Sequence, residues 1–405
     1  MSSTESSSGP GLGGKILRAS LGLVVVAAAA GVAARSIGIW RLGDPVDPPA
    51  KVRPVAEPVA ATGKTVTILA AGAILPTPEV WDQARRDGGG NGFDFAPMMS
   101  GARKTVSAAD LALCHLGTPL AAEGPFSGPP RYNAPAGIAE AIADTGFDGC
   151  ATAAEHAFDR GPAGLARTVD ALERAKVGHS GTYKSKGQSK QPRLYTADGV
   201  KVAHLSYTLT LNGGKLPAER DWSVAKATED EVKADARAAR QAGASIVVVS
   251  VDWGSEGEHE PDVDQQKLAR AIATMDDVDI VFGFGAHVVQ PAERIGDKWV
   301  LYGLGDFLSR DPQPVNGNRE GSMMRVTFSP GDQNDGWKVR AVEALPTFID
   351  LNPGIRVVDL EQALADPAVP AGRRRIYEAA VERIESHVLN RGGAGTVLRV
   401  RATSR

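Results

Sequence analysis

Two histidines and two carboxylates in this sequence have the side chains that a metal-dependent hydrolase needs. Glu155 and His156 are adjacent, and Asp252 and His287 follow later in the chain. Two imidazole nitrogens and two carboxylate oxygens can hold one zinc or manganese ion in a roughly tetrahedral arrangement. Asp252 or Glu155 could also take a proton from water as a general base. The sequence therefore allows a one-metal site if the fold brings these four side chains together.

Each of these residues follows a short apolar or β-branched run that is typical of a buried strand. In an α/β protein, the loops at the carboxyl ends of such strands form the usual ligand-binding edge of the sheet. We therefore expect the four side chains to lie at one edge. The strands expected to position them are Thr65–Ala70, Ala109–Leu116, Phe147–Thr152, Ile246–Val251 and Val278–Phe282.

Helical patterns alternate with these strands. An amphipathic stretch at Gly161–Lys176 and an alanine-rich, charged stretch at Glu229–Ala242 indicate helices. Further helices are expected at 133–143, Asp262–Met275 and Arg373–Leu389, and antiparallel strands at Met323–Phe328 and Trp337–Phe348. This order of elements predicts a mixed α/β sandwich in one large domain, residues 64–405.

The amino-terminal part of the chain has the pattern of a membrane or export signal. Lys15 and Arg18 precede the uncharged run Ala19–Ala34, which is slightly shorter than the roughly 17–25 residues of a membrane-spanning helix. Residues 15–40 are therefore expected to be a signal anchor that leaves the following domain outside the cell membrane. A cleaved signal peptide and a secreted protein are the alternative.

Two segments beside this run have the composition of unfolded chain. Residues 1–14 are rich in Ser and Gly, and we expect them to be disordered. Residues 41–63 are rich in Pro and Ala, which favours an extended spacer between the membrane and the domain.

Charge and cysteine content exclude some classes of function. The chain has 45 basic and 48 acidic residues mixed along its length, so it lacks the basic stripe of a nucleic-acid-binding protein. Its two cysteines, Cys114 and Cys150, have no CxxC spacing, which argues against a thiolate zinc site. They end the second and third expected strands. If those strands are neighbours and the domain lies outside, the two can form a disulfide; two buried free thiols are the alternative.

The order of several short motifs resembles the CapA family of poly-γ-glutamate capsule synthesis proteins, which are related to calcineurin-like metallophosphoesterases. The motifs are Cys114–Pro119, Ala154–His156, Asp252–Gly254, Gly283–Pro291 and Gly303–Asp306. The resemblance implies a calcineurin-like αββα four-layer sandwich. It also implies a membrane-attached, exocytoplasmic role in the synthesis or export of a polyanionic capsule.

Most metal ligands that the family places in these motifs are replaced. Only His156 and His287 match a family ligand, and Glu155 stands where the family has Asn. The other ligand positions hold Ala73, Gly117, Asp252, Phe284 and Gly285. Loss of carboxylates removes the charge that holds hard dications, so the site is either eroded and non-catalytic or remodelled around one ion. The cleft is expected to be lined by His115, Trp253, Phe284 and Asp306.

Two functions follow from these alternatives. The first is a protein that binds an anionic envelope polymer or capsule synthase proteins and has no cofactor. The second is a divalent-metal-dependent phosphoesterase or amide hydrolase, so the sequence leaves enzyme activity undecided. Near Asp252, Glu256, Glu258, His259 and Glu260 form a charged run that is typical of a solvated loop.

Overall fold

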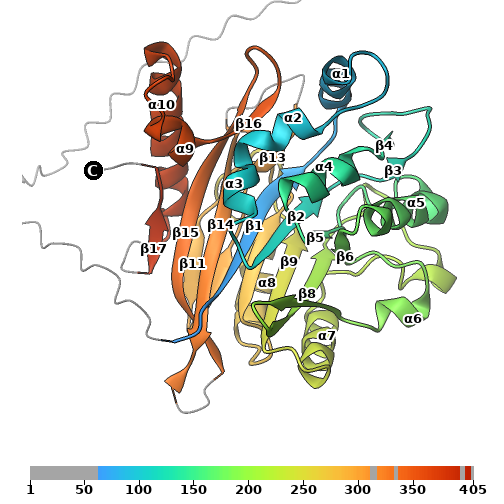
Figure 1. Ribbon diagram of the computed structural model, residues 1–405. Coiled ribbons are helices and arrows are strands. Elements are labelled where there is room, and N and C mark those ends of the chain that lie inside the picture. The colour runs from blue at the N-terminus through green and yellow to red at the C-terminus, as the bar shows by residue number, and fades with distance from the viewer. Residues whose placement is uncertain (1–62, 311–316, 333–335, 393–396, 403–405) are drawn as a thin grey trace, which may run out of the picture. The chain divides into compact units, whose positions relative to one another are not determined.

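The computed structural model describes residues 63–310, 317–332, 336–392 and 397–402 (Figure 1). The segments predicted at 1–14 and 15–40, and all but the last residue of 41–63, lie outside these residues and stay predictions. Within the described stretches, no helix is both long and apolar enough to cross a bilayer.

The first sheet contains nine strands among the described residues. They are β1 Val66–Ile74, β2 Leu111–Leu116, β5 Gly149–Ala151, β6 Gly178–Ser180, β13 Asp306–Leu308, β14 Glu320–Pro330, β15 Trp337–Asp350, β16 Arg356–Asp359 and β17 Leu398–Val400. The main order is β16-β15-β14-β1-β2-β5-β6. Strands β1, β2, β5 and β6 are parallel, so their carboxyl ends meet at one edge. Strands β14, β15 and β16 continue the sheet in antiparallel fashion.

The second sheet contains six strands within the described part of the chain, in the order β11-β12-β10-β9-β8-β7. Their bounds are β7 Arg193–Ala197, β8 Val200–Thr208, β9 Ile246–Asp252, β10 Ile280–Phe284, β11 Ala292–Ile295 and β12 Lys298–Leu301. Every residue of β9 and β10 is buried, as expected for parallel strands covered on both faces.

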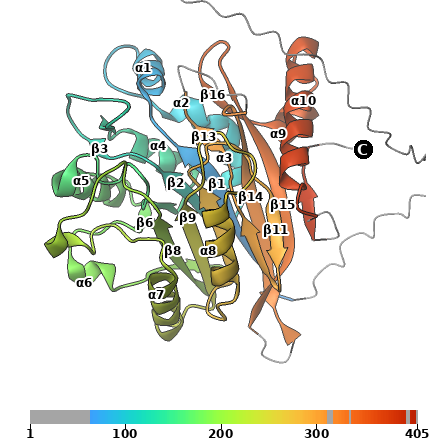
Figure 2. The same cartoon turned by 180° about the vertical axis from the view of Figure 1, so that it is seen from behind.

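Helices cover the outer faces of the two sheets (Figures 1 and 2). Those that pack on the first sheet are α1 Pro78–Asp87, α2 Ala96–Met99, α3 Arg103–Val106, α4 Ile138–Thr145 and α5 Gly161–Arg174. Those that pack on the second sheet are α7 Glu229–Gln241 and α8 Val263–Ala273. The remaining helices are α6 Lys186–Ser189, α9 Leu360–Ala365 and α10 Ala371–Val388.

Strand β1 shows how the sequence separates the hydrophobic cores. Its side chains alternate between the two faces of the sheet. Ile68 and Ala70 belong to the core between the sheets, together with Val248 of β9. Leu69 and Ala71 belong to the core beneath the outer helices. The predicted mixed α/β architecture is therefore confirmed, with two sheets packed face to face and helices outside.

One predicted helix begins later in the chain than expected. The helix expected from residue 133 begins at Ile138, because Ala134–Pro135 forms the short strand β4 beside β3, Leu120–Ala121. Pro135 fits an extended segment as well as a first helical turn, so the local sequence does not distinguish a strand from the start of a helix.

A disulfide joins two strands that lead into the candidate site. Cys114 of β2 and Cys150 of β5 lie directly opposite each other in the register, with their Cα atoms 4.4 Å apart. Both side chains are buried. The bond therefore ties β2, which contains His115, to β5, which precedes the Glu155–His156 loop.

Candidate functional site

The predicted residues gather where the parallel strands end, around a cavity of about 770 Å³ that we call the site cavity. Its wall combines loops after β1, β5, β9 and β10 with the start of β13. The described side chains that give it its chemistry are Glu79, Tyr132, Glu155, His156, Glu256, His287, Asp306 and Ser309. Three of the four proposed metal ligands therefore line one cavity. The fourth, Asp252, lies beneath it and is 7% exposed.

His287 is held by a carboxylate. Its Nδ1 lies 2.8 Å from Oδ1 of Asp306, and the Ser309 hydroxyl donates to the other oxygen of Asp306 at 2.5 Å. The backbone of His287 is left-handed, with φ 60°, which is uncommon for a residue with a side chain. Burial by itself lowers the pKa of His287, but the Asp306 carboxylate outweighs it and raises the pKa to about 9.

This raised pKa predicts a loss of stability in alkaline solution. The His287–Asp306 pair should stabilise the fold fully below pH 6.5, histidine's ordinary pKa, and lose that contribution as the pH rises through about 9. Because the His287 side chain is 28% exposed and partly screened by solvent, we expect the pair to contribute about 1–2 kcal/mol to the free energy of unfolding. Urea unfolding of wild type and His287→Gln in chelator should give a difference that shrinks between pH 6.5 and 9.5. A constant difference would contradict this assignment.

His156 forms the second histidine–carboxylate pair of the site, with a residue that was not among the predicted site residues. Its Nδ1 lies 2.9 Å from Oδ2 of Asp159, which also accepts a hydrogen bond from the amide of Tyr132 at 2.8 Å. Asn212 donates to the other oxygen of Asp159 at 2.8 Å. Burial raises the pKa of Asp159, but these hydrogen bonds outweigh it and lower the pKa overall. In the sequence, Asp159 is distinguished by its position three residues after His156.

Asp252 links two loops beneath the site cavity. Its Oδ2 accepts hydrogen bonds from the amide of Glu155 at 2.5 Å and from the hydroxyl of Thr208 at 3.1 Å. Its Oδ1 lies 3.7 Å from Nε2 of His115. Burial raises the pKa of Asp252 to about 6, although the hydrogen bond from Glu155 opposes this shift. The carboxylate thus fixes the start of the loop that carries Glu155 and His156.

Of the four residues expected to line the cleft, Asp306 does so, and the other three are buried below it. The rings of His115 and Phe284 stack at 4.6 Å with planes 9° apart. Trp253 donates from Nε1 to the carbonyl of Tyr302 at 2.8 Å. Burial lowers the pKa of His115 to about 3, so the ring is neutral at physiological pH. The reason for the difference is packing, because apolar contact draws these rings into the protein.

The residues present do not fit a two-metal centre. The Phe284 ring, stacked on His115, occupies one of the family's ligand positions. At another, Gly285 has φ 98°, and an added Cβ would lie 2.6 Å from the carbonyl of Trp253 and 2.7 Å from Oδ1 of Asp252. A histidine therefore could not be placed there without moving the backbone. Within the described parts of the chain, no three or more His, Cys, Asp or Glu side chains are placed to hold one metal ion.

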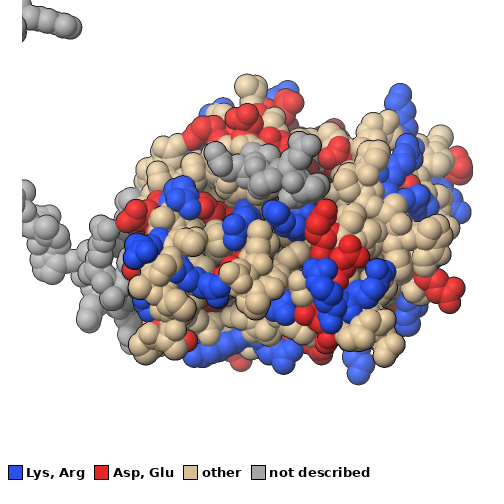
Figure 3. All heavy atoms as spheres, turned by 90° about the horizontal axis from the view of Figure 1, so that it is seen from above, with Lys and Arg blue, Asp and Glu red and all other residues tan. Residues whose placement is uncertain are grey.

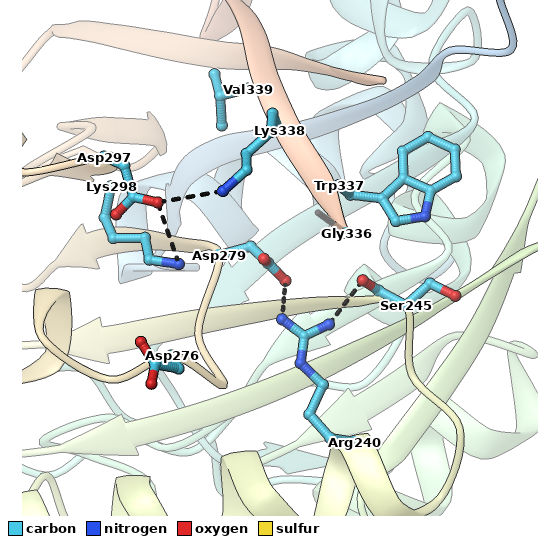
Figure 4. Close-up of a pocket in the computed structure, with 10 residues that line it drawn as sticks. All are labelled: Arg240, Ser245, Asp276, Asp279, Asp297, Lys298, Gly336, Trp337, Lys338 and Val339. Atoms are coloured by element: carbon cyan, nitrogen blue, oxygen red, sulfur yellow. Dashed lines mark hydrogen bonds and ion pairs between the residues drawn. The ribbon is translucent and has the colours of Figure 1, made fainter. Parts of the chain in front are cut away.

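A second cavity, of about 400 Å³, lies at the opposite ends of the second-sheet strands (Figure 4). Arg240 donates to Asp279 at 2.6 Å and to the carbonyl of Ser245 at 2.6 Å. Asp297 lies between the ammonium groups of Lys298 and Lys338, at 3.9 and 3.5 Å. These charges neutralise one another, so we assign this network to the structure of the fold.

The face seen from above mixes charges of both signs (Figure 3). Lys and Arg side chains alternate there with Asp and Glu, and they form no continuous basic area among the described residues in that view. This distribution gives no support to a nucleic-acid-binding surface on that face.

Two curated bacterial proteins are similar to parts of this chain. It is 27% identical over 168 residues to the PGA biosynthesis protein CapA of Bacillus subtilis (strain 168), covering 41% of this chain and 44% of that protein. It is 26% identical over 225 residues to a probable polyglutamine synthesis accessory protein of Mycobacterium tuberculosis (strain CDC 1551 / Oshkosh), covering 52% of this chain and 58% of that protein. The matched part of the chain thus spans about half the length of these relatives.

Among solved structures, a calcineurin-like phosphoesterase from Bacillus subtilis is similar with a TM-score of 0.42 and 11% identity, over 80% of this chain and 98% of that chain. The family description "Bacterial capsule synthesis protein PGA_cap" matches residues 67–311, which is more than half of the chain. The resemblance to the CapA family is thereby confirmed, and the chain belongs to the PGA_cap family of bacterial capsule synthesis proteins.

Proposed function

We propose that this protein is a membrane-tethered, exocytoplasmic member of its family that takes part in the synthesis or export of a poly-γ-glutamate-type polymer by binding, without catalysis. Family membership supports the polymer class, and the amino-terminal sequence at 15–40 supports the tether. The observation that carries the non-catalytic proposal is that two ligand positions of the family hold Phe284, whose ring stacks on buried His115, and Gly285, where a side chain has no room. Oδ2 of Asp252 is also engaged by two hydrogen-bond donors. The Nδ1 pairings of His156 and His287 leave both Nε2 atoms open and therefore favour neither function.

The charge of the site cavity determines which part of such a polymer fits it. Glu79, Glu155 and Glu256 line the cavity, whereas none of the described residues in its wall is Lys or Arg. His287 and Asp306 compensate each other's charge. The carboxylates of a polyanionic chain would therefore be repelled, and an amino group would be attracted. We infer that the cavity receives the free amino end of the polymer and that the chain body stays outside.

Calorimetry with the full-length protein tests this proposal. We expect saturable binding of a γ-linked glutamate oligomer with a free amino end, with the same affinity in EDTA. Acetylation of the amino end should weaken binding at least about tenfold, a loss of 1.4 kcal/mol or more of binding free energy. Glu256→Gln should weaken binding, whereas Ile376→Ala, a change at an exposed residue of α10 outside the cavity wall, should not. Equal affinity for both oligomers would overturn the amino-end assignment.

The competing function is a divalent-metal-dependent hydrolase with a one-metal site. It is favoured by the fact that Glu155, His156 and His287 line one cavity. Elemental analysis of the purified protein separates the two functions. Stoichiometric zinc or manganese, together with hydrolysis of a phosphoester or amide that Asp252→Ala abolishes, would replace the binding proposal. We expect neither metal at stoichiometric occupancy.

A further inference from the structure

Two histidines from distant parts of the chain stack face to face. The rings of His259 and His387 have centroids 3.6 Å apart and planes 4° apart. His259 belongs to the segment 254–261 between β9 and α8, which we call the bridging loop, and His387 lies in the last turn of α10. Parallel contact of this kind requires that the rings do not both carry a positive charge, because like charges at this distance repel strongly.

The bridging loop connects this stack to the site cavity. At one end, Glu256 and Gly257 line the cavity, and the amide of Gly257 donates to the carbonyl of Ala286 at 2.9 Å, beside His287. In its middle, Gln290 donates to the carbonyl of Glu258 at 2.8 Å. A displacement of the loop at His259 would therefore be transmitted to Glu256 in the cavity wall.

Backbone contacts set the protonation of His259. Its Nδ1 lies 2.8 Å from the carbonyl of Val289, so this nitrogen carries the proton that it donates. The opposite nitrogen faces the backbone of Gly317, where an added Cβ would lie only 2.9 Å from Nε2. A second proton on His259 would add a positive charge directly against the stacked ring of His387.

We propose that the His259–His387 stack is a pH-sensitive latch, which holds the bridging loop against α10 in neutral solution and releases it, loosening the wall of the site cavity, when both imidazoles are protonated. This inference goes beyond the proposed function, because it concerns access to the cavity and does not depend on which ligand enters.

Charged groups on every neighbouring element bear on this latch. From the loop itself, Glu260 accepts hydrogen bonds from Asn390 and Arg391, which follow α10. Glu258, also in the loop, faces solvent. From α10, Arg383 lies near His387 but is paired with Glu320 of β14. From β11, Glu293 pairs with Arg391. The carboxylates and guanidinium groups around the stack thus largely neutralise one another, and imidazole is the side-chain type whose charge ordinarily changes near neutral pH.

The direction of the pH effect follows from the surroundings of His387. Burial lowers its pKa, His259 and Arg383 lower it further, and Glu260 opposes them. A histidine whose pKa is lowered in the folded state stabilises that state above its ordinary pKa of about 6.5, and this contribution is lost as the pH falls below that value. The latch is therefore closed at pH 7.5 and weakened at pH 5.

Hydrogen exchange of the full-length protein, corrected for intrinsic rates, tests the latch. Between pH 7.5 and 5.0, we expect peptides that cover 254–261 and the end of α10 to become less protected by about tenfold. Peptides from α7, which is remote from the stack, should not change and serve as the internal control. An unchanged bridging loop in the wild type would overturn the proposal.

Substitutions separate stacking from titration. His387→Phe keeps a ring against His259 but cannot be protonated, so the loop should stay protected at both pH values. His387→Lys removes the stacked ring itself, so the loop should exchange fast at both pH values. His259→Phe provides a second non-titrating ring if the first variant does not fold. A pH step that persists in a folded phenylalanine variant would show that other groups cause it, and the latch would be discarded.

Discussion

Removing the Cys114–Cys150 disulfide is expected to lower the free energy of unfolding by about 3–4 kcal/mol, the largest effect of any substitution considered for this protein. The bond closes a loop with a sequence separation of 36 residues, and such a loop restricts the unfolded chain strongly. It also ties β2, which contains His115, to β5, which leads into the Glu155–His156 loop. Denaturant unfolding of the variant Cys114→Ala/Cys150→Ala against the oxidised wild type measures the difference.

Reductant provides the matched control for this experiment. Dithiothreitol should destabilise the wild type and leave the double alanine variant unchanged. The oxidised wild type should contain no titratable thiol after unfolding, because both of its cysteines are in the bond. The disulfide assignment would be contradicted if wild-type protein produced in an oxidising compartment contained two free thiols per chain and was as stable as the double alanine variant.

Replacing Asp252 by asparagine is expected to stabilise the protein by about 3 kcal/mol at pH 8 in the presence of chelator. Burial raises the pKa of this carboxyl from 3.8 to about 6, so the ionised form at pH 8 opposes folding. A carboxyl group whose pKa is raised in the folded state stabilises the fold at pH values below its unfolded-state pKa. This contribution is lost as the pH rises through the folded-state pKa. Asn keeps an oxygen that can accept from the Glu155 amide and the Thr208 hydroxyl.

The pH dependence distinguishes this explanation from a general packing effect. At pH 4 the folded wild type is protonated at Asp252, so the advantage of Asp252→Asn should largely disappear. Parallel urea titrations of both proteins at pH 4, 6 and 8 give the comparison. If the variant is instead less stable at pH 8, and zinc or manganese restores only the wild type, the carboxylate has a cationic partner and the one-metal alternative gains support.

The sequence was sufficient for the parts of the fold that depend on local pattern. The β-branched run Ile246–Val251 and the amphipathic run Gly161–Lys176 became β9 and α5 with shifts of one or two residues at their ends. Periodicity reports which face of an element is buried, and the motif order identified the family. Both signals are carried by neighbouring residues, so one chain is enough to read them.

The candidate site was harder to predict because it depends on contacts between distant residues. Sequence reasoning placed Phe284 and Trp253 in the cleft, yet their rings turn into the protein to stack on His115 and Tyr302. It also missed the carboxylate partners of His156 and His287. No local pattern reveals that Asp159 and Asp306 engage their Nδ1 atoms, because these pairings depend on loop geometry and rotamers.

The position of α10 has a consequence for the order in which this protein can fold. Five of its side chains, Tyr377, Ala380, Val381, Ile384 and Val388, complete the core between the sheets. Strand β1, near the start of the domain, pairs with β14, whose residues are made much later. During synthesis, the emerging chain therefore has β2 to pair with β1 but lacks the strand on the other side of β1. Folding of the sandwich cannot be completed until β14 and α10 have been made, so a chaperone would meet the growing chain incompletely folded.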